Sequence, residues 1–276
     1  MHLPIRLVLA LGLAVAMLSP APAFAQQPTG DPDRVISPLQ PDFTLVNLST
    51  TLRLPRFASA FRVTHRFWRP LAEGDVGDLL GDAFGLDSSA TTGLEYRFGL
   101  MRGLQVGVHR TSSKTITFFG QYSLMQEGDA RLIGLGVIAS MDGTNNFRDS
   151  YSPAIGVVLS RSIGRLGVVY VEPIWVNNSN PLPKDLVRDN DTILTGLGVR
   201  LKVLQTVYLV GEIVPRVAGY APSITHASFA LEKRAGRHMF QLNVSNGVAT
   251  TMSDLGRGGT DNDAWYLGFN LSRKFF

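Results

Sequence analysis

Two polar residues close together in the sequence are of the types that catalyse hydrolysis. His226 and Ser228 lie two residues apart, so on a β-strand they would face the same side. A serine attacks an ester only when a histidine takes its proton and a further polar group orients that histidine. No obvious orienting asparagine follows the pair, which weakens the case for a hydrolase.

Two Asp-Asn-Asp triplets, at 189–191 and 261–263, are the other candidates for chemistry. Carboxylate and amide oxygens spaced in this way can bind Ca²⁺, but no twelve-residue calcium-loop pattern surrounds either triplet. Asx-turns that lead into a strand are the ordinary explanation. We therefore predict neither a metal site nor any other cofactor.

Composition excludes several further classes of protein. The chain has no cysteine, so disulfides, thiolate metal sites and cysteine nucleophiles are ruled out. Its net charge of +4 is small and dispersed, which argues against a nucleic-acid partner. The sequence also lacks a Walker loop, a zinc-protease motif, a nucleophile elbow and a credible dinucleotide fingerprint.

The N-terminus has the features of an export signal. Arg6 is followed by a short apolar run over 7–18 and then by Ala23-Phe24-Ala25, a typical cleavage site. We predict a signal peptide over 1–25. Prolines recur from Gln26 to Leu48 without a clear period, which predicts a periplasmic linker or strap over 26–48.

From 49 to 276 the sequence alternates between apolar and polar residues, the pattern of β-strands. In one example Phe240, Leu242 and Val244 alternate with polar residues. The pattern predicts twelve strands, over 57–68, 91–98, 104–111, 115–125, 131–140, 151–160, 166–176, 192–203, 206–216, 225–233, 238–245 and 264–276.

The connections between these strands alternate in length. Short turns are expected around 99–103, 126–130, 161–165, 203–206 and 234–237. Long loops are expected over 69–90, 141–150, 177–191, 217–224 and 246–263. Tight turns at one end, longer loops at the other and an even number of strands are typical of barrels in the bacterial outer membrane. We therefore predict an all-β fold, a single transmembrane antiparallel up-and-down β-barrel of about twelve strands over 49–276.

The distribution of side chains agrees with a barrel whose outer face contacts lipid. Trp68, Trp175 and Trp265 all fall at the rim that carries the long loops, where the membrane interface favours amphipathic rings. Most acidic residues fall in those loops. The few acidic residues within strands are on the parity opposite the aliphatic residues, so they are expected to point inward.

The sequence resembles a known family in three stretches: G-L-D-S-S-A-T-T-G-L-E-Y-R-F-G-L at 85–100, L-Q-V-G-V-H-R-T-S-S-K-T at 104–115 and Y-S-L-M-Q-E-G at 122–128. They look like a bacterial β-barrel family catalogued only as a domain of unknown function. The resemblance extends over about 50–276 and is strongest over 61–128. It implies an outer-membrane barrel and no particular activity.

Charged residues on the inward parity are the candidate site. They are Arg62, Arg66, Glu95, Arg97, His109, Glu172, Arg200, Glu212 and Glu232. They would form a structural network that fills the lumen, or they would line a narrow pathway for small polar solutes. Inward glycines leave space for water or for a folded-in segment.

Two functional classes follow. The first is a narrow channel for small polar solutes, and the alternative is a structural or scaffolding barrel that binds a partner through its acidic outer loops or its periplasmic segment. An open lumen would favour the channel and a plugged lumen the scaffold. An enzyme is not expected, because the parity of Ala227 and Phe229 turns His226 and Ser228 into the lumen, away from lipid.

Two further segments carry predictions. Within the loop 69–90, a short amphipathic helix could cover the barrel mouth. The chain ends on an alternating strand with Phe275 and Phe276, which resembles the signal that the bacterial barrel-assembly machinery recognises. That machinery and the lipid of the outer membrane are the expected partners, and the sequence leaves the oligomeric state open.

Overall fold

The computed structural model describes most of the chain after residue 30. The described residues are 31–74, 77–78, 89–128, 131–180, 190–221, 223–261 and 263–276. The chain divides into two units, residues 1–32 and 33–276, and all of the β-strands belong to the second unit. Among the described residues, no helix is long and apolar enough to cross a membrane.

The second unit consists mainly of β-strands. They are β1 (Ser59–Pro70), β2 (Ala90–Met101), β3 (Leu104–Thr111), β4 (Ile116–Met125), β5 (Gly134–Gly143), β6 (Tyr151–Ile163), β7 (Gly167–Val176), β8 (Thr192–Leu204), β9 (Val207–Val214), β10 (Arg216–Ala218), β11 (His226–Ala235), β12 (His238–Ser245) and β13 (Tyr266–Phe275). The short helices of the described chain are η1 (Pro32–Arg34), α3 (Thr144–Phe147) and α4 (Met252–Arg257).

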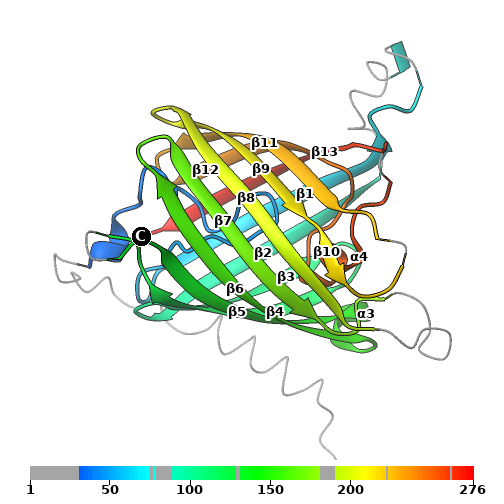
Figure 1. The fold of residues 1–276 in the computed structure, drawn as a ribbon, viewed down its shortest axis with the longest axis horizontal. Coiled ribbons are helices and arrows are strands. Elements are labelled where there is room, and N and C mark those ends of the chain that lie inside the picture. The colour runs from blue at the N-terminus through cyan, green and yellow to red at the C-terminus, as the bar shows by residue number, and fades with distance from the viewer. Residues whose placement is uncertain are drawn as a thin grey trace, which may run out of the picture. The chain divides into compact units, whose positions relative to one another are not determined.

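These strands close into a barrel (Figure 1). Each strand pairs antiparallel with its neighbours, and β13 pairs with β1, starting at Ser59 opposite Phe275. β10 continues β9 beyond Pro215, because both segments pair with β8. The two segments therefore count as one strand of the barrel wall. The fold is a closed antiparallel barrel of twelve strands, which confirms the sequence prediction.

The outer surface of the barrel is apolar and its inner surface is largely polar. On β11, Phe229 is 53% exposed whereas Ser228 and Glu232 are fully buried. Such a pattern is the inverse of a soluble domain and suits a wall that has lipid outside and a polar interior. Trp68 and Trp175, at the ends of β1 and β7, are exposed on the outside.

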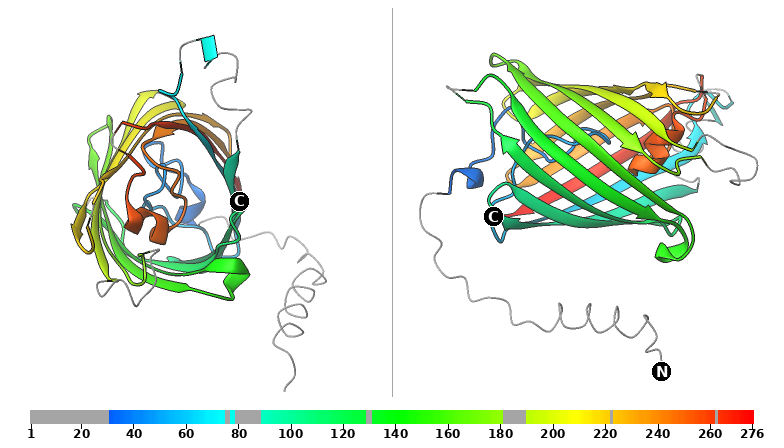
Figure 2. Two further views of the ribbon diagram at one scale, coloured as in Figure 1. Left: turned by 90° about the vertical axis from the view of Figure 1, so that its right-hand side faces the viewer. Right: turned by 60° about the horizontal axis from the view of Figure 1, so that its bottom comes forward.

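The two ends of the barrel differ. The end where β1 begins and β13 finishes carries the short connections, and we call it the turn end (Figure 2). The opposite end carries the long connections and α4, and we call it the loop end. All three tryptophans lie at or next to strand termini of the loop end, as expected for an aromatic rim.

An apolar core lies inside the barrel. Leu45, Val46 and Leu48, which precede β1, pack there with inward residues of the wall and with Leu255 of α4. The sequence predicted a periplasmic linker or strap over 26–48 and a barrel from residue 49. In the structure residues 41–46 and 48 are buried inside the barrel, and the first strand begins at Ser59.

Some predictions concern residues outside those described. The signal peptide predicted over 1–25 lies there, as do residues 26–30 of the predicted linker. Most of the loop 69–90, with its predicted short helix, lies there too, so both expectations stay predictions.

Candidate functional site

The N-terminal segment 41–54 lies in the lumen, and we call it the plug segment (Figure 2). Its centre forms a narrow hairpin, in which the Leu45 N–H donates to the Leu48 carbonyl at 2.8 Å and the Thr50 N–H donates to the Phe43 carbonyl at 2.9 Å. The hairpin has few bonds of its own. Its remaining backbone groups must therefore find partners on the wall, because a buried peptide group without a partner is costly.

The tip of the hairpin encloses the carboxylate of Glu212, which projects from β9. The backbone N–H groups of Val46, Asn47 and Leu48 donate to its oxygens at 3.0–3.1 Å. The side-chain amide of Asn47 donates at 2.8 Å. Hydrogen bonds to an ionised acceptor are about twice as strong as neutral ones, so this carboxylate is a strong anchor for the plug segment.

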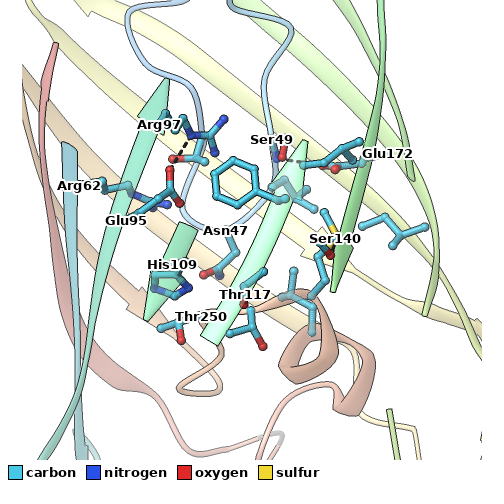
Figure 3. Close-up of a pocket in the computed structure, with 18 residues that line it drawn as sticks. Asn47, Ser49, Arg62, Glu95, Arg97, His109, Thr117, Ser140, Glu172 and Thr250 are labelled. Carbon is cyan, nitrogen blue, oxygen red and sulfur yellow. Dashed lines mark hydrogen bonds and ion pairs between the residues drawn. The ribbon is translucent and has the colours of Figure 1, made fainter. Parts of the chain in front are cut away.

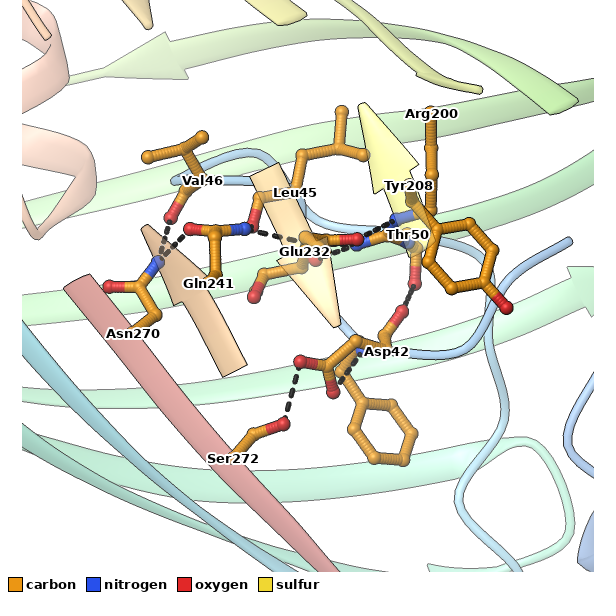
Figure 4. Close-up of polar contacts among 12 residues, drawn as sticks. Asp42, Leu45, Val46, Thr50, Arg200, Tyr208, Glu232, Gln241, Asn270 and Ser272 are labelled. Carbon is orange, nitrogen blue, oxygen red and sulfur yellow. Dashed lines mark hydrogen bonds and ion pairs between the residues drawn. The ribbon is translucent and has the colours of Figure 1, made fainter. Parts of the chain in front are cut away.

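Cations and amides of the wall bind the carbonyl groups of the same hairpin (Figure 4). Arg200 donates to the Thr44 carbonyl at 2.6 Å and Arg62 donates to the Val46 carbonyl at 2.5 Å. Gln241 donates to the Leu45 carbonyl at 3.0 Å. Inward side chains of the wall thus hold the plug segment on both sides of its backbone.

The base of the plug segment is attached to the last strand. Lys274 forms an ion pair with Asp42 at 2.8 Å, and Ser272 donates to the second oxygen of Asp42 at 2.7 Å. Burial alone would raise the pKa of Asp42, but Lys274 and the hydrogen bonds lower it to about 2. Phe276 packs against a small apolar cluster that includes Phe43.

Two inward glycines of β8 make room for the hairpin. A Cβ atom on Gly198 would overlap the side chain of Leu45, and one on Gly196 would overlap that of Leu48. The sequence predicted that inward glycines leave space for water or for a folded-in segment. At Gly196 and Gly198 a folded-in segment occupies that space.

The loop end is narrowed by residues 246–260, which we call the cap loop. Its helix α4 lies inside the barrel mouth (Figure 2), with Ser253 and Leu255 buried. The Ser253 N–H donates to Asp142 of β5 at 3.0 Å, and Arg216 donates to the Gly256 carbonyl at 3.1 Å. Plug segment and cap loop thus enter the lumen from opposite ends.

A small cavity of about 60 Å³ remains between them (Figure 3). Arg62, Glu95 and Arg97 form one side, and Glu172 of β7 lies on the other. The plug segment contributes Ser49, whose N–H donates to Glu172 at 2.9 Å. Such a volume holds a few water molecules or a small solute.

All nine candidate residues of the lumen point inward in the structure. Eight of them are buried, and the side chain of Glu95 keeps only 12% of its surface exposed. Four of them, Arg200, Glu232, Arg66 and Glu212, belong to one hydrogen-bonded network, in which Gln241, Asn270 and Asn47 supply the connecting amides. Arg200 pairs with Glu232 at 2.8 Å, and Arg97 pairs with Glu95 at 2.5 Å. Arg66 donates to Asn270 at 2.9 Å, and His109 lines the cavity.

His226 and Ser228 come together but lack the features of a hydrolytic site. Their side chains are 3.1 Å apart, and Asn47 of the plug segment lies 3.2 Å from the same ring nitrogen. The other nitrogen of His226 has no hydrogen-bond partner among the described residues. Both side chains are fully buried against the plug segment, away from the lipid face.

Of the two acidic triplets, the one at 261–263 shows an Asx-type turn contact, whereas Asp191 of the other bonds across its loop. Asp261 accepts from the Asp263 N–H at 3.3 Å, and Asp191 accepts from the Asn177 amide at 2.6 Å. The described residues contain no group of three or more histidine or acidic side chains that could hold a metal ion.

Sequence reasoning missed several residues that hold the plug segment. Asn47 and Asp42 were assigned to a linker, and Lys274 and Gln241 were not singled out as inward polar residues. A signal was present, since Phe43, Leu45 and Leu48 are apolar residues in a segment interpreted as a periplasmic linker or strap. Lys274 also falls on the inward parity of its strand.

Comparison with known proteins identifies the family. A family model described as a membrane bound beta barrel domain (DUF5777) matches residues 42–275. The chain belongs to this family. The match starts at Asp42, so the plug segment is part of this membrane-bound β-barrel domain together with the strands.

Among solved structures, an outer-membrane channel from Pseudomonas putida F1 is similar to the chain. Its TM-score is 0.52 at 13% sequence identity, and the match covers 81% of this chain and 97% of that one. At such identity the likeness shows the fold alone. The match to the outer-membrane phospholipase A of Escherichia coli has a TM-score of 0.42 at 11% identity, covering 79% and 93% of the two chains.

A mutant porin of Rh. blastica has a TM-score of 0.35 at 10% identity, with 67% of this chain and 55% of that one covered. The scores of the porin and of the phospholipase are too low to support an argument. A search of curated protein sequences gives no match.

Proposed function

We propose that this barrel is a gated channel of the bacterial outer membrane, which passes small polar solutes when its plug segment leaves the lumen. The predicted signal peptide and the apolar outer surface support the location. The inner wall, rich in charged and amide side chains, supports polar solutes as cargo.

One observation carries the proposal: the wall holds the plug segment through its backbone. Glu212 binds N–H groups of the hairpin tip, and Arg62 and Arg200 bind its carbonyl groups. The same wall groups are suited to water or a passing solute once the segment moves, because they are charged and face the lumen. A barrel that needed only a filled interior would gain more from apolar packing than from buried charges.

The energetics permit such movement. Ordering a residue costs about 1–2 kcal/mol of backbone entropy. Burying an aliphatic side chain such as Leu45 or Leu48 contributes about 1.5–3 kcal/mol. In a segment where only some side chains are apolar, these contributions largely offset one another, and hydrogen bonds to the wall then decide whether the plug segment stays docked.

A permanently closed scaffold is the second candidate. The plug segment and the cap loop together fill much of the lumen, which favours a barrel that binds a partner through its acidic outer loops or its N-terminal extension. The two candidates differ in one respect: a scaffold keeps its plug segment docked, and a channel releases it.

A reversible cross-link between plug segment and wall separates them. The hydroxyl oxygens of Thr51 and Ser160 lie 2.6 Å apart, so cysteines at both positions are within reach of a disulfide. The natural chain contains no cysteine, so these two residues are the only thiols that can form a disulfide. Solute flux would be measured by swelling of liposomes that contain the full-length protein.

The channel proposal predicts flux of small sugars through the wild-type protein and the reduced double variant, and loss of flux when the double variant is oxidised. Wild-type protein under the same redox conditions is the control. Absence of flux in the reduced double variant and in the wild type would reject the channel and favour the scaffold.

A further inference from the structure

The cavity between plug segment and cap loop has a shape and charge pattern suited to a ligand. Its volume of about 60 Å³ corresponds to roughly four to six water-sized groups. It is lined by strands of the wall, by Ser49 of the plug segment and by Thr250 of the cap loop. A molecule with about five non-hydrogen atoms would fit.

Glu172 is the strongest indication of a ligand. It is 1% exposed, and Figure 3 shows its side chain directed toward Ser49 and the cavity. One carboxylate oxygen accepts the Ser49 N–H, and the other has no hydrogen-bond partner among the described residues. No lysine or arginine of the described chain forms an ion pair with it.

The other buried glutamates of the wall differ from Glu172 in this respect. Glu212 is enclosed by the hairpin tip. Both oxygens of Glu232 accept hydrogen bonds from Arg200, and one of them also accepts from Gln241. A buried carboxylate is retained when a cation or several donors stabilise it. Glu172 therefore lacks what the neighbouring glutamates have, a donor for its second oxygen.

The opposite side of the cavity offers cationic donors. A guanidinium carries five N–H donors, and that of Arg62 makes one hydrogen bond within the described residues, to the Val46 carbonyl. Arg97 lies beside it and pairs with Glu95 (Figure 3). The hydroxyl oxygen of Thr250, which also lines the cavity, is buried without a partner among the described residues.

We infer that this cavity binds a small zwitterion of the size of an amino acid, with its ammonium group on Glu172 and its carboxylate toward Arg62. The ammonium supplies the donors that Glu172 lacks, and the Thr250 hydroxyl, which lies on the side of His109 (Figure 3), offers the ligand a further hydrogen bond. Both charges of the ligand are then matched on opposite sides of one cavity, which a singly charged molecule would not achieve.

A role for this site in binding a solute on its way through the barrel rests on the proposed channel function. Binding itself can be measured without transport. Ligand-observed NMR on the full-length protein in detergent micelles would compare three probes: glycine, methylammonium and acetate. Glycine is expected to bind most tightly, because it alone satisfies both sides of the cavity.

Glu172→Gln keeps the size of the side chain and replaces its carboxyl group with an amide, which cannot pair with an ammonium group. It is expected to weaken glycine and methylammonium binding at least tenfold and to leave acetate unchanged. Glu127→Gln is the matched control, because Glu127 binds Ser162 outside the cavity. Heat-modified migration in gels would establish that each variant is folded.

Thr250→Val provides a second variant in the cap loop, where a folding defect of the barrel is less of a concern. Loss of one hydrogen bond is expected to weaken glycine binding roughly two- to tenfold. Equal binding of glycine by the wild type and both cavity variants, or no binding of any probe, would overturn the inference. Glycine binding without solute flux would reject the channel and retain the site, and flux without glycine binding would do the reverse.

Discussion

Glu212→Gln is predicted to undock the plug segment, because the carboxylate of Glu212 is the acceptor for the hairpin tip. Its oxygens accept the N–H groups of Val46, Asn47 and Leu48 at 3.0–3.1 Å and the Asn47 amide at 2.8 Å. Glutamine retains one acceptor oxygen and turns an NH₂ group toward N–H donors. A hydrogen bond to a charged group contributes about 1.5–3 kcal/mol, so the net loss is about 3 kcal/mol.

The population of the undocked state should then rise roughly 100-fold, since each 1.4 kcal/mol is a factor of ten. Because the chain has no cysteine, Val46→Cys gives a single reporter at a position with no exposed surface. A water-soluble thiol reagent reacts with it only when the plug segment leaves. Where opening and closing are fast, the labelling rate follows the open population.

The assay therefore compares labelling rates of Val46→Cys alone and together with Glu212→Gln. Glu127→Gln in the same background is the control for removing a carboxylate elsewhere. Labelling that accelerates less than about threefold in the Glu212→Gln protein would refute the assignment of Glu212 as the anchor. Rapid labelling of Val46→Cys alone would refute the docked plug segment itself.

Three further changes give predictions at other points of the lumen. Lys274→Met leaves Asp42 buried without its cation and should lower the free energy of unfolding at pH 7 by about 3–5 kcal/mol, as measured by urea titration. Because the pKa of Asp42 is lowered to about 2, the stabilisation from the ion pair is complete above about pH 4 and is lost as the pH falls through 2. The stabilities of wild type and variant should therefore converge near pH 2. Gly198→Ala places a Cβ atom against the hairpin and, with an overpacking cost of about 1–3 kcal/mol, should raise thiol labelling of the plug reporter about ten- to a hundredfold. Deletion of Phe276 should leave barrel assembly in cells nearly intact and loosen the base of the plug segment. Deletion of both Phe275 and Phe276 should strongly reduce assembly. Equal amounts of heat-modifiable barrel from both truncations would contradict the role of this terminus as an assembly signal.

The strands were predictable because their period of two is local information. The spans 104–111 and 238–245 are the same in the sequence prediction and in β3 and β12. Over most of these two strands one parity is apolar and the other polar, so the type of a residue indicates its face, with exceptions such as Arg110 and Met239. Alternating loop lengths then sufficed to close the barrel.

The plug segment was not predictable in the same way. Residues 41–54 have almost no periodic structure, and their bonds go to residues such as Glu212 and Gln241, more than 160 positions away. No local pattern encodes such partners. The alternation of apolar and polar residues showed that Glu212 and Arg200 point into the lumen. It could not show that their partners lie in residues 41–54, because that contact exists only in the closed barrel.

One strand of the wall carries an indication of the plug segment in its own sequence. On β7 both faces are largely apolar, since Val168 and Tyr170 point to the plug segment while Val169 and Val171 face outward. Apart from Glu172, the inner face of this strand is largely apolar, because it packs against the leucines of the plug segment. An apolar run on both parities of a barrel strand is thus a sequence indication of a filled lumen.

The single-channel current of the Thr51→Cys, Ser160→Cys protein tests the central claim most directly. The oxidised protein in a planar bilayer should be silent, and addition of a reductant during the recording should produce discrete openings, more frequent when Glu212→Gln is also present. A current that is unaffected by reduction, or silence in the reduced Glu212→Gln protein whose plug segment is accessible to label, would contradict a channel gated by its own N-terminal segment.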